Sequence, residues 1–164
     1  ERVLAFSRSP SSSERLAEAA GKKGLTGIVV DDADALVADS DIVISMVPAA
    51  VGLQGFLDAR KLKPNAFVAA VDVGRSWLPE SFAAFDRLVT DSRTQIQTPY
   101  DAGGKPVESA KFETDLVAIC GGEKVERGSR NLFCFRGFAL GDLALATLVY
   151  NEARTRGAGN PLPR

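Results

Sequence analysis

A short apolar run, residues 67–71, most constrains the fold that this chain can adopt. A proline and an asparagine precede it, and an Asp-Val-Gly turn follows it. A run of this length between turn residues is typical of a buried strand in a parallel sheet, apolar on both faces. Because ligands of such sheets bind beyond the carboxyl ends of the strands, Asp72, Arg75 and Ser76 are candidate site residues. An ordinary turn with a solvated Arg75 would have the same sequence.

Similar apolar runs recur along the chain and alternate with segments of helical pattern. Further strands are predicted at residues 2–6, 26–30, 41–47, 88–90 and 132–135. Helices are predicted after a Ser11–Glu14 capping box, within residues 31–40, at residues 79–85 and over residues 137–156. This alternation predicts an α/β fold with a Rossmann-like, doubly wound parallel sheet.

The chain lacks the glycine-rich turn that opens a dinucleotide-binding unit. Residues 2–6 are similar to the second strand of such a unit, whose first strand is the centre of the sheet. We therefore expect residues 1–150 to be a partial dinucleotide-binding domain, without the first strand and the glycine-rich loop. Residues 151–164 would lead towards a second domain. The alternative is that residues 2–6 begin a different, smaller fold.

The end of the first predicted strand carries information on the cofactor. An acid at this position hydrogen-bonds the ribose 2′-hydroxyl of NAD. This chain has Ser7, Arg8 and Ser9 instead. A guanidinium group matches the geometry of a phosphate, and two hydroxyl groups add donors. The segment therefore favours NADP, with NAD possible as a cofactor, unless it is a turn with a solvated Arg8.

Composition excludes several classes of protein. The chain has 164 residues, 45% of them hydrophobic, and a net charge of −1 without a long run of one sign. We therefore expect no nucleic-acid partner and no membrane partner. Cys120 and Cys134 lack metal-ligand spacing and fit core positions of a cytoplasmic protein better than a disulfide. The absence of histidine removes histidine-dependent nucleophiles, and no metal site is predicted.

Four segments in order resemble the ornithine cyclodeaminase/mu-crystallin family. They are SDIVISMVPA at residues 40–49, LKPNAFVAAVD at residues 62–72, a strand ending in VTD at residues 89–91, and GFALGDLALATLVYNEARTRGAG at residues 137–159. Each motif alone is weak, but their order and spacing together are specific. Members are about twice as long as this chain, so the resemblance implies that the N-terminal half, with the glycine loop and the carboxylate grip, lies outside it.

The resemblance also implies an activity. The enzymes of this family transfer hydride between a nicotinamide and the carbon of an amino or imino acid. They include cyclodeaminases, alanine dehydrogenases, and ketimine and pyrroline-carboxylate reductases. We therefore expect an NADP(H)-dependent oxidoreductase for a small amino or imino acid, homodimeric through the other domain. The alternatives are a non-catalytic NADP-binding protein of mu-crystallin type, or a dehydrogenase of another Rossmann family.

The family pattern after the strand at residues 67–71 is V-G-(G/S)-D, and its aspartate corresponds to Gly74 here. Asp72 lies two positions earlier and therefore points to the same side of the strand. The resemblance makes Asp72 the candidate catalytic residue, although it could also be a structural acid. Arg75 and Ser76 are candidate substrate-binding residues that could have taken over the contact.

Other matched positions are candidate cofactor contacts. Met46, Val47 and Pro48 occupy the strand-end loop that lines the cofactor in the family, and Val71 ends the neighbouring strand. Gly137 begins the segment whose backbone approaches the nicotinamide end. A glycine at a helix start allows such a close approach, but it would equally suit tight helix packing.

Overall fold

The chain folds into parallel strands that are connected by short helices. The computed structural model describes residues 1–50, 52–94, 110–137 and 139–160. Its strands are β1 (Arg2–Ala5), β2 (Thr26–Val29), β3 (Ile42–Ser45), β4 (Phe67–Ala70), β5 (Arg87–Thr90), β6 (Thr114–Asp115) and β7 (Asn131–Cys134). Its helices are α1 (Pro10–Lys22), α2 (Ala33–Asp39), α3 (Leu116–Cys120) and α4 (Ala139–Thr155), with 3₁₀ helices η1 (Ala59–Lys61) and η2 (Pro79–Ala84).

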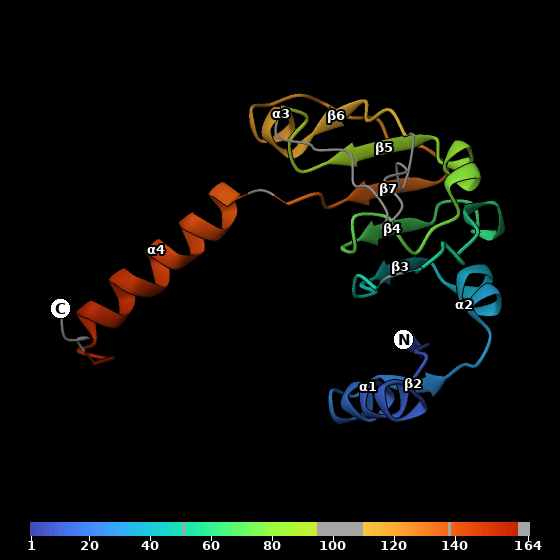
Figure 1. Cartoon of the computed structure of the whole chain (residues 1–164), viewed down its shortest axis with the longest axis horizontal. Coiled ribbons are helices and arrows are strands. Elements are labelled where there is room, and N and C mark those ends of the chain that lie inside the picture. Colours follow the sequence, from blue (N-terminus) through green and yellow to red (C-terminus); the bar gives the residue numbers. More distant parts are fainter. Residues whose placement is uncertain (51, 95–109, 138, 161–164) are drawn as a thin grey trace.

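The strands form two sheets in which every pair is parallel (Figure 1). One contains β1 and β2, and the other has the order β3-β4-β7-β5-β6. This arrangement confirms the predicted α/β fold with a parallel sheet, and each predicted strand is present. The two-residue strand β6 was not predicted, because it is too short to show a period.

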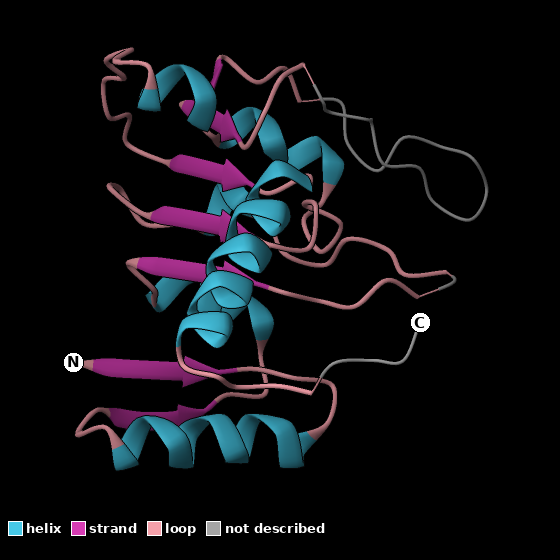
Figure 2. Ribbon diagram, turned by 90° about the vertical axis from the view of Figure 1, so that its left-hand side faces the viewer, coloured by secondary structure: helices cyan, strands magenta, loops and turns pink. Residues whose placement is uncertain are grey.

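The two sheets are separated at β1 and β3. Figure 2 shows their strands pointing the same way, with a wider space between β1 and β3 than between paired neighbours. No strand pairing joins β1 to β3 in the described part of the chain. In a doubly wound sheet of order 3-2-1-4-5-6, one strand stands between the strands that match β1 and β3. The separation is therefore the one expected of such a sheet without its central strand.

The core lies on one face of the five-stranded sheet. Val43, Val68 and Leu132 point into it from β3, β4 and β7, where they pack with Trp77 and its buried neighbours. Successive residues of a strand point to opposite faces, so Ile42, which is 64% exposed, lies on the open face. Phe67 and Val71 are also exposed. The prediction that residues 67–71 are buried on both faces is therefore wrong for these two residues.

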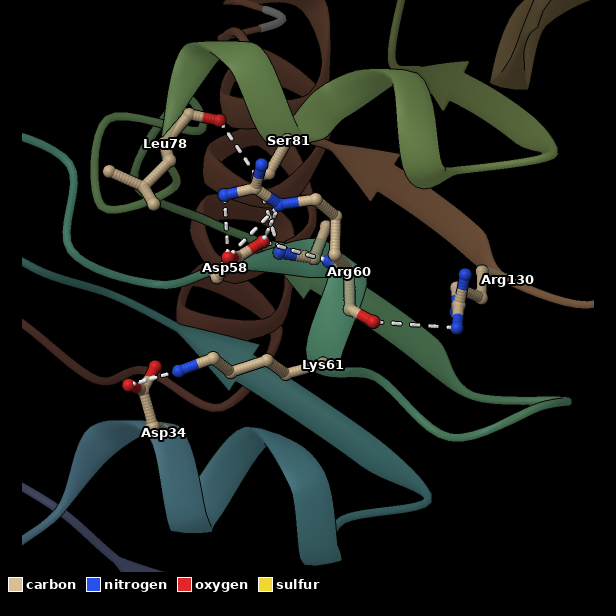
Figure 3. Close-up of polar contacts among 8 residues, drawn as sticks. Asp34, Asp58, Arg60, Lys61, Leu78, Ser81 and Arg130 are labelled. Carbon is tan, nitrogen blue, oxygen red and sulfur yellow. Dashed lines mark hydrogen bonds and ion pairs between the residues drawn. The ribbon is translucent and has the colours of Figure 1, made fainter.

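Polar contacts fasten the connection between β3 and β4 (Figure 3). The Asp58 carboxylate accepts hydrogen bonds from the backbone N–H and the side chain of Arg60, which closes the first turn of η1. Ser81 accepts the N–H of Ala59 at 3.1 Å and donates to the carbonyl of Leu78. These bonds join η1 to η2 and fix the layer that covers the core face.

The helix at the start of the chain differs in detail from its prediction. The Ser11–Glu14 capping box is wrong, because α1 begins at Pro10 with Ser9 as its N-cap residue and without a side-chain cap. The fixed φ of proline suits the first helical position, which explains the earlier start. The segment at residues 79–85 forms the 3₁₀ helix η2 rather than an α-helix.

Helix α4 projects away from the sheet (Figure 1). Its apolar residues Leu140, Leu143 and Leu148 are each more than half exposed, so its apolar face is not part of the described core. The helix runs through residue 150 without interruption, and the predicted domain boundary there stays a prediction. Among the described residues, none of the helices combines the length and apolar character needed to span a bilayer.

Candidate functional site

A pocket of about 300 Å³ lies at the carboxyl ends of β3, β4 and β7. Because β4 pairs with β3 on one side and with β7 on the other, the loops that follow these three strands meet here. The lining residues are Met46, Val47, Pro48, Ala49, Val71, Asp72, Val73, Arg75, Phe135, Arg136 and Gly137. Most of them are apolar, and two are cations.

Asp72 is buried at the end of β4 and accepts four hydrogen bonds. Its Oδ1 accepts from the Ser45 hydroxyl at 3.1 Å and from the Gly74 N–H at 3.2 Å. Its Oδ2 accepts from the Val47 N–H at 3.2 Å and from the Ser76 hydroxyl at 2.7 Å. The carboxylate therefore ties the end of β3 to the end of β4, and both of its oxygens are occupied by donors.

The indole of Trp77 extends this network. Its Nε1–H donates to the Ser45 hydroxyl at 3.1 Å, and Ser45 in turn donates to Asp72. Trp77 and Ser76 are fully buried. Ser76 is therefore not in the lining of the pocket, and its hydroxyl contacts the lining residue Asp72.

The turn after Asp72 has an unusual backbone. Both Val73 and Gly74 have positive φ angles, 57° and 79°. A Cβ atom on Gly74 would lie 3.1 Å from Cζ of Phe82 and 3.4 Å from Sγ of Cys134. The position that matches the family aspartate is therefore both conformationally restricted and filled by its neighbours, which suits glycine.

Two guanidinium groups, those of Arg75 and Arg136, line the pocket together with the Asp72 carboxylate. Arg75 is half-buried, and its side chain makes no hydrogen bond or ion pair with any residue that the structure describes. Arg136 lies over the ring of Phe112 at 5.0 Å. Burial lowers the pKa of Arg136 to about 10, and the nearby charge of Asp91 opposes this shift. The pocket is therefore suited to an anionic group such as a carboxylate.

Cys134 ends β7 beneath the pocket and is fully buried. Burial raises the pKa of its thiol to about 12, and the negative charges of Asp72 and Asp91 add to this increase. A thiol with this pKa is not a nucleophile at neutral pH. In the described part of the chain, no cluster of cysteine, aspartate and glutamate side chains is arranged to hold a metal ion.

The predicted cofactor residues Ser7, Arg8 and Ser9 connect β1 to α1. Because the strands of both sheets point the same way, this turn lies at the same edge as the pocket (Figure 2). Ser9 has no side-chain capping bond, and its hydroxyl contacts that of Ser11 at 3.0 Å. Arg8 is exposed, and no described residue forms an ion pair with it.

Seven predicted site residues come together in the pocket. They are Met46, Val47, Pro48, Val71, Asp72, Arg75 and Gly137. Sequence reasoning missed Ala49, Val73, Phe135 and Arg136. Arg136 had a usable signal, because it follows a buried strand in the way that Arg75 follows β4. No sequence signal pointed to Val73, because a β-branched residue is not expected in the left-handed conformation that it has here.

No protein-family model and no curated protein matches the chain. Several solved structures share its fold, among them the following three. The iminosuccinate reductase of Paracoccus denitrificans, in complex with NAD+, has a TM-score of 0.80 at 23% identity over 100% of this chain and 52% of its own. The Delta(1)-pyrroline-2-carboxylate reductase of Thermococcus litoralis, in complex with NADH and L-proline, has a TM-score of 0.76 at 22% identity over 99% of this chain and 53% of its own.

The third is a probable ornithine cyclodeaminase from Bordetella pertussis Tohama I, with a TM-score of 0.72 at 22% identity over 98% of this chain and 54% of its own. The chain thus spans about half the length of these proteins. Their names agree with the resemblance drawn from the sequence motifs. The chain has the Rossmann-like fold of the corresponding half of these proteins.

Proposed function

We propose that this chain is the nucleotide-binding part of an NADP(H)-dependent oxidoreductase that acts on a small amino or imino acid. The observation that carries the proposal is the pocket at the carboxyl ends of β3, β4 and β7, with Arg75 and Arg136 in its lining. Parallel sheets bind ligands at this edge. Two solved structures of the same fold were obtained with a nicotinamide dinucleotide, and one of them also holds L-proline.

The residues present fit a dinucleotide at this edge of the sheet. Arg8, which has no ionic partner among the described residues, would bind the 2′-phosphate of NADP together with Ser7 and Ser9. Gly137, with a φ of 102° and open space around its Cα, allows close approach of the nicotinamide end. Met46, Val47, Pro48 and Val71 would line that end. The bound cofactor supplies or accepts the hydride.

Arg75 and Asp72 have different roles in this proposal. Arg75 would bind the substrate carboxylate, because its guanidinium lines the pocket and is not paired with a described residue. Asp72 is the proposed catalytic residue. Since it accepts four hydrogen bonds and donates none, it would act as a fixed negative charge beside the substrate nitrogen rather than by proton transfer. Ser76 would hold the Asp72 carboxylate in position through its hydrogen bond.

One observation favours a second candidate, a non-catalytic NADP-binding protein of mu-crystallin type. Both oxygens of Asp72 are fully engaged, and Gly74 stands where the family aspartate is expected. In this reading Asp72 only fastens the two strand ends. Two further expectations remain. A homodimer formed through the other domain rests on the resemblance, and a cytoplasmic location rests on the two cysteines.

The full-length protein tests both candidates. We would titrate it with NADPH and NADH, and then follow NADPH oxidation with 1-pyrroline-2-carboxylate and with iminosuccinate. Turnover that Asp72→Asn lowers about a hundredfold per folded molecule supports the enzyme. NADPH binding without turnover of either imino acid supports the non-catalytic protein. Absence of binding to both dinucleotides would overturn both candidates.

A further inference from the structure

Val73 has a backbone conformation that valine rarely adopts. Its φ of 57° lies in the left-handed region, where the β-branched side chain crowds the backbone. Among the described residues, Asn65 is the other non-glycine residue with a positive φ, and asparagine tolerates this region well. Strain of this kind persists where surrounding contacts enforce it, and it is concentrated at functional sites.

Buried groups on both sides hold Val73 in this conformation. The Asp72 carboxylate accepts the N–H of Gly74, and the Asp72 carbonyl accepts the N–H of Arg75 at 3.2 Å. The carbonyl of Gly74 accepts the N–H of Trp77, which is fully buried, at 3.1 Å. The turn is therefore fixed before any ligand arrives.

The strained turn places Val73 in the lining of the pocket. Val73 lies between two other lining residues, the exposed Val71 and the half-buried Arg75. Met46 and Phe135 add apolar surface from the neighbouring strand ends. The pocket thus offers an apolar wall beside a cation. A complementary ligand has an apolar body next to an anionic group.

We propose that Val73 is a specificity-determining residue that selects carboxylic acids with an apolar, ring-like body, with the body against its isopropyl group and the carboxylate at Arg75. This inference rests on the proposed function, and it adds the class of substrate. A cyclic imino acid has this shape, whereas the imine of pyruvate has the carboxylate but only a methyl group to pack against the wall.

The first measurement tests the strain. Val73→Gly removes the side chain that is crowded, whereas Val71→Gly, two residues earlier on the same edge, removes a valine whose φ is not positive. We expect Val71→Gly to lower the melting temperature by about 3–6 °C, and Val73→Gly to leave it unchanged or raise it. Equal losses in the two variants would show that Val73 is not strained.

The second measurement tests selection of the substrate. In the full-length protein, Val73→Ala and Val73→Gly should lower kcat/KM for 1-pyrroline-2-carboxylate about tenfold. The value for the imine formed from pyruvate and ammonia should change less than threefold, and the Kd of NADPH should stay within about twofold. Val73→Ala keeps the backbone strained, so a loss in Val73→Gly alone would overturn the side-chain contact.

The outcomes separate this inference from the proposed function. If the unmutated protein reduces neither imine, the proposed oxidoreductase fails on its own. If it reduces both, and the Val73 variants keep the same preference between them, the oxidoreductase stands and the role of Val73 is wrong.

Discussion

The hydroxyl of Ser76 donates a 2.7 Å hydrogen bond to Oδ2 of Asp72, and neither side chain is more than 5% exposed. Ser76 is fully buried, so this carboxylate is its partner in place of water. The bond closes the turn that carries Val73 and Arg75 back onto the end of β4. Asp72 lines the pocket and Ser76 does not. The position of a lining residue therefore depends on a hydrogen bond from a residue outside the lining.

Replacing Ser76 by alanine should destabilise the protein. The change removes a hydrogen bond to a charged group, and such a bond contributes about 1.5–3 kcal/mol. Ser129→Ala is the matched control, because Ser129 is exposed and its side chain makes no hydrogen bond with a described residue. Urea unfolding of both variants measures the effect. A loss in Ser76→Ala no larger than in Ser129→Ala would contradict the role of the bond.

Arg8 should determine the preference for NADP(H) over NAD(H). Loss of a charge-assisted contact with the 2′-phosphate in Arg8→Ala should cost about 1.5–3 kcal/mol of NADPH binding and little NADH binding. Calorimetric titration with each dinucleotide measures this, and Lys22→Ala at the other end of α1 is the control. Equal affinity of the unmutated protein for the two cofactors would end the claim.

Arg75 should control the affinity for the acid substrate but not for the cofactor. Arg75→Ala removes the proposed carboxylate contact, so KM for 1-pyrroline-2-carboxylate should rise about 10- to 100-fold, while the Kd of NADPH stays constant. Arg75→Lys keeps the charge without the planar fork and should fall between the two. A selective loss of NADPH binding would instead assign Arg75 to a cofactor phosphate.

The two cysteines should differ in reactivity. With a pKa of about 12, only about one in ten thousand Cys134 thiols is ionised at pH 8, and burial shields it further. Cys120 is exposed. Iodoacetamide should therefore modify Cys120 in the native protein and Cys134 only after unfolding, as peptide mass spectrometry would show. Modification of both at similar rates would contradict the buried position of Cys134.

Asp58 should contribute to the loss of stability in acid. Hydrogen bonds from the Arg60 side chain, together with its backbone N–H and charge, hold the pKa of Asp58 below the ordinary value of 3.8. The Asp58 carboxylate therefore binds a proton more readily in the unfolded chain than in the folded one. Its contribution to the free energy of unfolding is present above pH 3.8 and is lost as the pH falls through the lowered pKa.

The comparison with Asp58→Asn isolates this effect. Asparagine can still cap η1 but does not titrate. Above pH 5 the unmutated protein should be more stable by on the order of 1 kcal/mol, and the difference should shrink once the pH falls below the ordinary value of 3.8 and through the lowered pKa of Asp58. Urea unfolding from pH 3 to 7 measures it. A difference that is independent of pH would exclude this titration as the cause.

Six of the seven described strands, and the edge of the sheet where the candidate site lies, could be predicted from the sequence. Apolar runs such as residues 67–71 and the turn residues after them are local signals, and they predicted parallel strands with Asp72 and Arg75 at a carboxyl end. Arg136 follows β7 in a similar way, but it was not predicted. These features could be read because the side chains involved are neighbours along the chain.

How those residues act together depends on contacts that form only in the folded chain. Ser45 reaches Asp72 across 27 residues of sequence, and the parallel register of β4 and β7 brings Arg136 to the pocket that Arg75 lines. The positive φ of Val73 is likewise imposed by buried partners against the local preference of valine. Contacts between distant segments have no local pattern, so the occupied oxygens of Asp72 and the strained turn could be found only in the folded chain.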